Sequence, residues 1–193
     1  MAPPSPGPAL TPHFRDFLPA WVARQPWYAG SEAPSLRAVG FIRLRDPAGE
    51  VGLETHLVTD GTDVYQVPMT YRGAPEPQAD LIAEAEHSEL GHRWIYDAAT
   101  DPVWIDTVLR MVLANGASEP EPDRLPAPAD ARGRLLTPDR PDITTLTVRV
   151  RRKLAAGRPT DAAGAVGVVT GTWYPDGPEA PPVRGWLATV HRG

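Results

Sequence analysis

Residues 39–71 read VGFIRLRDPAGEVGLETHLVTDGTDVYQVPMTY, and this stretch decides the fold. Apolar and polar side chains alternate through three of its segments, with the period of a half-buried strand. The three segments are Val39–Arg45, Val51–Leu57 and Val64–Tyr71. The connections between them, Asp46–Gly49 and Asp60–Thr62, have the composition of tight turns. Because short turns join antiparallel neighbours, the stretch predicts a three-stranded antiparallel meander.

A helix is predicted before this meander, over residues 12–24. Its apolar face follows the spacing i, i+3, i+4, i+7, i+8. The residues of that face are Phe14, Phe17, Leu18, Trp21 and Val22. Thr11 is expected to cap the helix, with Pro12 at its first position. Pro19 is expected to kink the helix or to end it after Leu18.

Two further helices are predicted after the meander. Ala79–Leu90 has helical composition, and Gly91 is a plausible C-terminal stop. Asp101 then starts a second helix over residues 102–115, which has one apolar face. Between the two helices, Arg93–Tyr96 is expected to be extended.

The remaining segments complete a predicted α+β fold. Residues 1–10 are expected to be a disordered tail, because four prolines in eight residues prevent regular hydrogen bonding. Residues 11–116 form the main domain, and the proline-rich residues 117–142 are expected to be a linker or a long loop. Residues 143–193 are expected to add antiparallel strands, which pack on the first sheet or extend it. The three strand segments there are Thr145–Leu154, Ala165–Tyr174 and Val183–Val190.

Composition excludes several classes of function. The 193 residues include 19 basic and 24 acidic side chains, a net charge of -5, which disfavours nucleic-acid binding. The basic cluster Arg149–Lys153 is interpreted as a solvent-facing strand surface. The absence of cysteine excludes disulfides and thiolate chemistry. The N-terminus lacks the features of a secretory signal, and no stretch is long and apolar enough to span a bilayer. We therefore expect a cytoplasmic protein that does not contact membranes.

Motifs for phosphate or metal binding are incomplete. Gly164, Gly167 and Gly171 are not followed by the Lys-Ser/Thr pair of a phosphate-binding loop. They are interpreted as small residues that thin a strand for close packing. His87 and His92 are five residues apart, whereas the helical zinc motif needs four. The sequence therefore predicts no metal site.

Two sets of residues remain as candidates for chemistry or binding. Glu54 and His56 lie on one face of a predicted strand and could form an acid–base pair, although such pairs are common on solvated strand faces. Four aromatic side chains could stack on a sugar or anchor a protein partner, although such clusters more often belong to the core. These aromatic residues are Trp27, Tyr28, Trp94 and Tyr96.

Three motifs together resemble the N-terminal cap domain of actinobacterial maltokinases. They are Trp21–Gly30, Tyr65–Arg72, and His87–Ala98 followed by Asp101-Pro102. Their order and spacing match that cap, and the resemblance covers residues 11–116. Two positions depart from the cap pattern, because Pro26 replaces an arginine and Ser31 a lysine.

The resemblance implies a cystatin-like fold, in which an antiparallel sheet curls against a helix. Maltokinases use ATP to phosphorylate maltose for α-glucan synthesis linked to trehalose, but their kinase machinery follows the cap. This chain contains no phosphate loop, catalytic aspartate motif or metal-binding motif of that kind. No catalytic residue and no cofactor is therefore carried over.

The resemblance therefore implies a non-catalytic protein that binds or regulates a partner in trehalose, maltose or α-glucan metabolism. The partner would be a kinase or another enzyme of that metabolism. The candidate surface for this partner, or for a ligand, consists of Trp27, Tyr28, Arg72, Arg93, Trp94, Tyr96 and Asp97. The alternatives are a module that binds a sugar or nucleotide, and an enzyme of unrecognised type. A homodimer also stays open.

Overall fold

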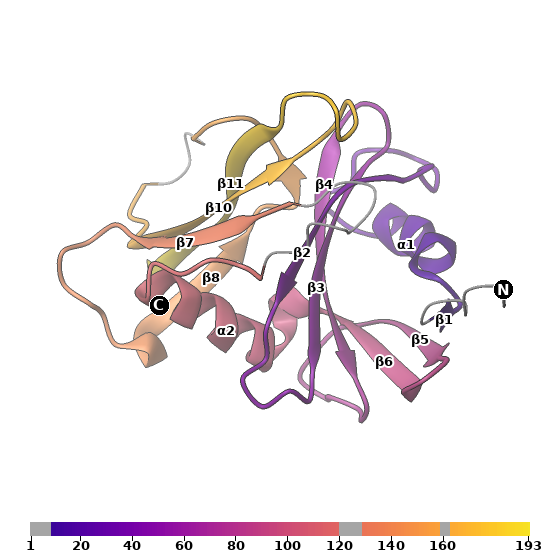
Figure 1. The fold of residues 1–193 in the computed structure, drawn as a ribbon, viewed down its shortest axis with the longest axis horizontal. Coiled ribbons are helices and arrows are strands. Elements are labelled where there is room, and N and C mark those ends of the chain that lie inside the picture. The colour runs from indigo at the N-terminus through magenta and orange to yellow at the C-terminus, as the bar shows by residue number, and fades with distance from the viewer. Residues whose placement is uncertain (1–8, 120–128, 159–162) are drawn as a thin grey trace, which may run out of the picture.

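The computed structural model of the chain describes residues 9–119, 129–158 and 163–193. Two antiparallel sheets and two α-helices make up most of this part (Figure 1). The α+β class predicted from the sequence is confirmed. Residues 1–8, most of the predicted tail, lie outside the described residues.

The larger sheet has seven strands and contains the predicted meander. Six of them follow the order β1-β5-β6-β4-β3-β2, and β9 pairs with β4 beside that path. Their bounds are β1 Leu10–Thr11, β2 Arg37–Leu44, β3 Gly52–Thr59, β4 Val64–Arg72, β5 Leu81–His87, β6 Gly91–Asp97 and β9 Lys153–Leu154. β2, β3 and β4 pair in sequence order, so the alternating pattern of residues 39–71 predicted this part of the topology.

The smaller sheet has four strands in the order β7-β10-β11-β8. Their bounds are β7 Ala131–Leu135, β8 Leu146–Val150, β10 Gly167–Trp173 and β11 Val183–Arg192. β7 lies within residues 117–142, the segment expected to be a linker or loop. Residues 143–193 thus build a second sheet together with β7. They also meet the first sheet, because β9 pairs with β4 and the Tyr174 N–H donates to the Val39 carbonyl of β2.

The continuous strand predicted over Thr145–Leu154 is divided. β8 pairs with β11 of the smaller sheet, whereas β9 pairs with β4 of the larger one. The chain crosses from one sheet to the other at Arg151 and Arg152, where the Arg152 carbonyl accepts a hydrogen bond from the Gln66 N–H. An alternating pattern does not predict this crossing, because it indicates the period of a strand but not which strand it pairs with.

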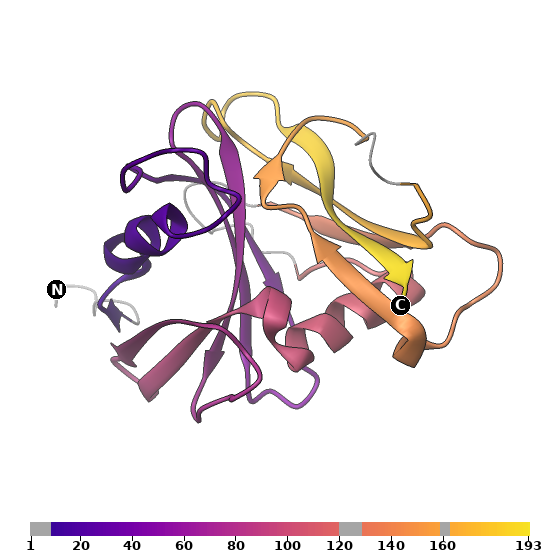
Figure 2. The ribbon, with the colours of Figure 1, turned by 180° about the vertical axis from the view of Figure 1, so that it is seen from behind.

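The two faces of the larger sheet are covered by different elements. α1 (Phe14–Ala23) lies on one face, and α2 (Pro102–Leu113) lies on the other, together with the smaller sheet (Figures 1 and 2). Two short 3-10 helices, η1 (Ala98–Thr100) and η2 (Ile143–Thr145), precede α2 and β8. Each face of the larger sheet therefore has its own hydrophobic core.

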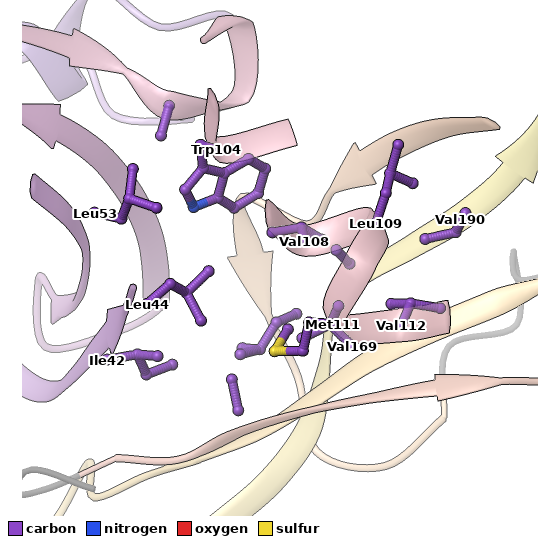
Figure 3. Close-up of a cluster of buried hydrophobic side chains, with 14 of the residues drawn as sticks. Ile42, Leu44, Leu53, Trp104, Val108, Leu109, Met111, Val112, Val169 and Val190 are labelled. Atoms are coloured by element: carbon purple, nitrogen blue, oxygen red, sulfur yellow. The ribbon is translucent and has the colours of Figure 1, made fainter. Parts of the chain in front are cut away.

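α2 packs closely on the smaller sheet because glycines face it. A Cβ on Gly133 would lie 2.7 Å from the backbone of Met111, and one on Gly167 would lie 2.4 Å from Val112 Cγ1. The other side of α2 packs against the larger sheet, and Figure 3 shows Trp104 and Val108 on that side. The close packing predicted for the Gly-rich run is therefore confirmed at Gly167.

The helix predicted over Ala79–Leu90 is wrong, because β5 forms there and pairs with β6. Leucine, alanine and glutamate favour helices, but residues 83–87 also alternate: Ala85 is buried whereas Glu84 and Glu86 on either side of it are exposed. Burial of the apolar side chains beneath α1 and pairing with β6 override the weak intrinsic preference.

The start of α1 also differs from the prediction. His13, not Thr11, is the N-cap: its side chain accepts from the Arg15 N–H, and the Asp16 carboxylate accepts from the His13 N–H. Thr11 belongs to β1. The helix continues through Pro19, since the buried face that includes Leu18 stabilises it against the loss of one hydrogen bond.

Candidate functional site

Arg72 and Asp101, two of the motif residues, form a buried ion pair between β4 and the start of α2. The Nε and Nη2 atoms of Arg72 each donate to the Asp101 carboxylate at 2.7 Å. Thr70 donates a further bond at 2.7 Å, and the Val103 N–H donates to the same carboxylate, which caps α2. The Asp101 side chain is 0% exposed, so the pair holds the helix on the sheet.

The electrostatics of Asp101 agree with that structural role. Burial raises the pKa of a carboxyl group, but hydrogen bonds from Arg72, Thr70 and Val103 outweigh burial here and lower the pKa of Asp101. The carboxylate is therefore ionised throughout the neutral range. It is also saturated with donors, which leaves it no free position for a ligand.

Asp97 and Arg152 form a second internal pair, at the point where the chain crosses between the sheets. Arg152 Nη2 donates to Asp97 Oδ2, and the guanidinium lies 5.7 Å from the ring of Trp27. Asp97 also accepts from the Ala99 N–H and so caps η1. The interpretation of Arg149–Lys153 as a solvated face therefore fails at Arg152, whose side chain is 14% exposed.

The aromatic candidates divide between interior and surface. Trp27 and Tyr28 are partly buried, with ring centroids 5.6 and 5.8 Å from that of Tyr65. Tyr96 is 4% exposed, and its hydroxyl oxygen accepts from the Glu76 N–H. Trp94 shares the face of Tyr96, as the sequence predicts, but it lies further out on the hairpin and stays half-buried.

The outward face of the β5–β6 hairpin carries an ionic and aromatic cluster. Glu84 lies opposite Trp94, and Glu86 lies opposite His92. His92 Nδ1 is 2.7 Å from a Glu86 oxygen, and His92 Nε2 is 2.9 Å from a Glu84 oxygen. The Trp94 ring meets the His92 ring edge-on at 4.4 Å. Together with Leu81, which is 48% exposed, we call these residues the hairpin surface.

This hairpin surface is acidic and contains one titratable cation. The hydrogen bond with Glu86, and then that with Glu84, raise the pKa of His92 above its ordinary value. Nearby Arg93 turns away and donates to the Leu90 carbonyl. His87 accepts from the Glu89 and Leu90 N–H groups at the turn. The described residues contain no group of three side chains suited to holding a metal ion.

The charge of the two halves of the molecule differs in sign. Residues 9–119 contain 16 acidic and 8 basic side chains, whereas residues 129–158 and 163–193 contain 5 acidic and 10 basic ones. The hairpin surface lies in the acidic half. It is therefore suited to a partner surface that is basic and partly apolar.

Glu54 and His56, the candidates for an acid–base pair, lie together on the α1 side of β3. His56 Nε2 is 3.5 Å from Glu54 Oε2, and the His56 ring packs against Phe14 and Phe41. Burial raises the pKa of Glu54, but His56 and Arg43 lower it to about 2. So low a pKa makes Glu54 a weak base, and the two phenyl rings enclose the imidazole.

Residues 21–101 match the family model of the maltokinase N-terminal cap domain, which confirms the resemblance predicted from the sequence. The match begins inside α1, includes β2 to β6 and ends at Asp101. A search of curated proteins gave no match. Within the described residues, neither helix is long and apolar enough to cross a membrane.

Sequence reasoning missed two features of the site. It assigned no role to Arg152, because the partner of that residue is 55 positions away and only the fold brings the two together. It also missed Glu84 and Glu86, because a helix was predicted there. Their alternation with buried Ala85 was the signal that could have placed both on one strand face.

Proposed function

We propose that the chain is a maltokinase-cap-like binding module, which engages a partner enzyme of trehalose, maltose or α-glucan metabolism. The observation that carries this proposal is the match of residues 21–101 to the maltokinase N-terminal cap domain. In this proposal the chain is non-catalytic, and its long antiparallel sheet with α1 against one face is the cystatin-like arrangement of such a cap. The proposal includes a cytoplasmic location.

The contacts of the motif residues support the hairpin surface as the place where the partner binds. Arg72 and Asp97 are engaged in internal ion pairs. Trp27 packs in the α1 core, and the Tyr96 hydroxyl is bound to the backbone. His92 and Trp94 instead contact each other and face outward. They are therefore the motif residues best placed to contact another molecule.

The chemistry of the hairpin surface specifies the kind of partner. Two carboxylates flank the imidazole and an indole packs against it, while an exposed leucine lies on the same face opposite Tyr96. Aromatic side chains at the centre of an interface contribute much of its binding energy, whereas flanking charges set specificity and association rate. We expect a basic partner surface with an apolar depression that accepts Trp94.

A direct titration tests the proposal. The purified chain is titrated by calorimetry into a maltokinase kinase body without its own cap, and separately into trehalose synthase. Binding to one of them should weaken at least about tenfold in Trp94→Ala and in the double variant Glu84→Lys, Glu86→Lys. Asp106→Asn, at an exposed position of α2, is the matched control and should bind like the original chain.

Two outcomes contradict the proposal at different levels. Failure of the unaltered chain to bind either enzyme removes the assignment to this metabolism. If both hairpin variants still bind and unfold at the same temperature as the original chain, the partner enzyme is supported but the hairpin surface is not where it binds. Fractionation of cells that express the tagged chain tests the cytoplasmic location.

A further inference from the structure

The outer edge of β8 differs from the outer edges of β2 and β7. Three residues from elsewhere in the chain cover the edge of β2, because the N–H groups of Glu119, Ala129 and Tyr174 donate to its carbonyls. The edge of β7 is covered in the same way by residues 116–118. β8 is the last strand of the smaller sheet, beside β11 (Figure 2), and no described segment pairs with its other edge.

A hydrogen bond just before β8 shows which backbone groups lie on this edge. The Gly193 N–H, next to β11, donates to the Thr145 carbonyl. The N–H and C=O groups of successive residues point to alternate sides of a strand. Odd-numbered residues of β8 therefore point these groups toward β11, and even-numbered residues point them outward. The open edge consists of the Leu146 C=O, the Val148 N–H and C=O, and the Val150 N–H, and such groups form a template for another strand.

The two faces of β8 present different side chains beside this edge. Leu146, Val148 and Val150 point toward α2, where both valines are only partly buried. Thr147 and Arg149 point to the opposite face, and both are exposed. β8 contains no proline and pairs with β11 without a bulge, so it lacks two of the features by which edge strands avoid pairing.

The smaller sheet is basic. Its four strands contain five arginines and no acidic residue. All five are exposed: Arg132, Arg134, Arg149, Arg184 and Arg192. Only Arg132 has a carboxylate at ion-pair distance within the described part of the chain, that of Asp130 at 3.4 Å. A second β8 would bring the same arginines to the edge, so like charges oppose pairing with another copy, whereas an acidic strand is attracted.

We propose that β8 binds an extended acidic segment of a partner protein, which adds to the smaller sheet as a fifth strand. Apolar and acidic side chains alternate along this segment. The apolar ones pack beside Val148 and Val150 on the α2 side, and the acidic ones lie beside Arg149 on the other. The backbone groups of the edge supply affinity, and the arginine charge selects the sequence. The proposal is independent of the partner proposed for the hairpin surface.

A hexapeptide in which glutamate and valine alternate tests this edge, with a lysine–valine hexapeptide as its counterpart of opposite charge. Calorimetry measures the affinity, and amide hydrogen exchange followed by NMR locates the site. The Val148 and Val150 amides should exchange rapidly in the free chain and at least about tenfold more slowly with saturating glutamate peptide. N-methylation of the peptide's valines should abolish binding, because their N–H groups face β8, whereas N-methylation of its glutamates should not.

Substitutions in the chain test the charge and the backbone separately. Arg149→Glu should weaken binding of the glutamate peptide at least about tenfold and reverse the preference over the lysine peptide. Arg134→Glu is the matched control: it makes the same charge change on β7, roughly 14 Å away and beyond the screening length at physiological salt, so binding should change little.

Val148→Pro removes an outward N–H without breaking the ladder with β11, and it should abolish binding. Thermal unfolding of each variant separates lost binding from lost fold. The N-methylated peptides test the same hydrogen bonds if the proline variant does not fold.

Four results overturn the proposal. Slow exchange of the Val148 and Val150 amides in the free chain would show that the edge is already covered. Failure to bind the glutamate peptide, or equal affinity for both peptides, would show that charge does not select the segment. Binding of the peptide methylated at its valines would rule out strand addition. Protection of the same amides by raising the concentration of the chain alone, with a dimer in sedimentation, would identify a second copy as the occupant.

Discussion

The two faces of the seven-stranded sheet differ in how they are covered. The face toward α2 and the four-stranded sheet has a core of 23 buried apolar residues among those described, whereas the α1 face has 10. The first core is closed by a whole sheet. The second is covered by one helix of ten residues and one aromatic loop, and a groove between α1 and the start of β2 lies at its margin. The hairpin surface lies on the first face, where Trp94 pairs with Arg72.

This difference separates the residues that stabilise the fold from those available to bind. Arg72 and Asp101 lie on the face toward α2, and their hydrogen bonds are made with each other inside the molecule. Arg15 on the first turn of α1 is exposed, and so is more than a third of the His92 side chain, which lies on the sheet face of Arg72 but near the turn of the hairpin. A motif residue in this molecule therefore indicates function only after its internal partners are known.

The largest expected effect on stability comes from a substitution of Asp101, whose carboxylate is buried between the sheet and α2. Asp101→Asn removes a buried charge opposite Arg72 and should lower the free energy of unfolding by about 3 kcal/mol. Urea denaturation at neutral pH measures this change. Asp106→Asn, an exposed position on the same helix, is the control and should leave the unfolding midpoint almost unchanged.

The same variant tests the pH dependence of stability. The pKa of Asp101 is lowered in the folded chain from its ordinary value of 3.8. The stabilisation is therefore complete above that ordinary value and is lost as the pH falls through the lower folded pKa. The stability difference between the unaltered chain and Asp101→Asn should be constant at neutral pH and shrink in acid. A difference that grows in acid would contradict the lowered pKa.

A second test addresses the contact between α2 and the smaller sheet. Gly133→Ala places a methyl group 2.7 Å from the Met111 backbone, so the helix must shift, at a cost of about 2 kcal/mol. Gly116→Ala is the control, because its added carbon would lie at an ordinary 3.5 Å from the Met111 carbonyl oxygen. Equal stability of the two variants in thermal unfolding would show that α2 does not pack as described.

A smaller loss is expected at the chain crossing, which joins the two sides. Arg152→Met leaves the Asp97 carboxylate without its guanidinium partner and should cost between about 1 and 2 kcal/mol. Arg149→Met, an exposed arginine on β8, is the comparison and should change the unfolding midpoint little. If both variants were equally stable, Arg152 would not link the two sheets.

The smallest effect on stability is expected at the hairpin surface. Glu86→Gln removes the main contact that raises the pKa of His92, so the His92 pKa should fall toward 6.5 while the unfolding midpoint stays the same. The His92 stabilisation is present below that ordinary pKa and is lost as the pH rises through the raised one. An NMR titration of the imidazole measures the change. Glu89→Gln, outside these contacts, should leave the titration unaltered.

The sequence predicted the regular parts of the fold well. The alternation in residues 39–71 identified three strands and their antiparallel order, and the Asp101-Pro102 signal located the start of α2. The helix predicted over Ala79–Leu90 was wrong, because the composition of the segment and its alternation indicate different structures. Composition favours a helix, but the edge of β6 offered a strand partner. Local preference decides only when no tertiary partner opposes it.

The candidate site was predicted less completely than the fold. The motifs pointed to Arg72, Trp94 and Asp97, but they did not separate internal contacts from surface ones. The groove beside α1 was not predicted, because the residues that line it come from elements on either side of the aromatic loop. Such a groove forms only when the fold brings distant segments of the chain together.

The sequence by itself determined the period of most strands, the apolar faces of both helices and the resemblance to a maltokinase cap. These are local properties, because a side chain's face follows from backbone geometry and a motif follows from residue order. Only the tertiary structure decided that β8 and β9 belong to different sheets, that Asp97 meets Arg152, and that His92 faces outward. Those outcomes depend on which distant segment supplies the pairing edge or the opposite charge, and no local pattern encodes that choice.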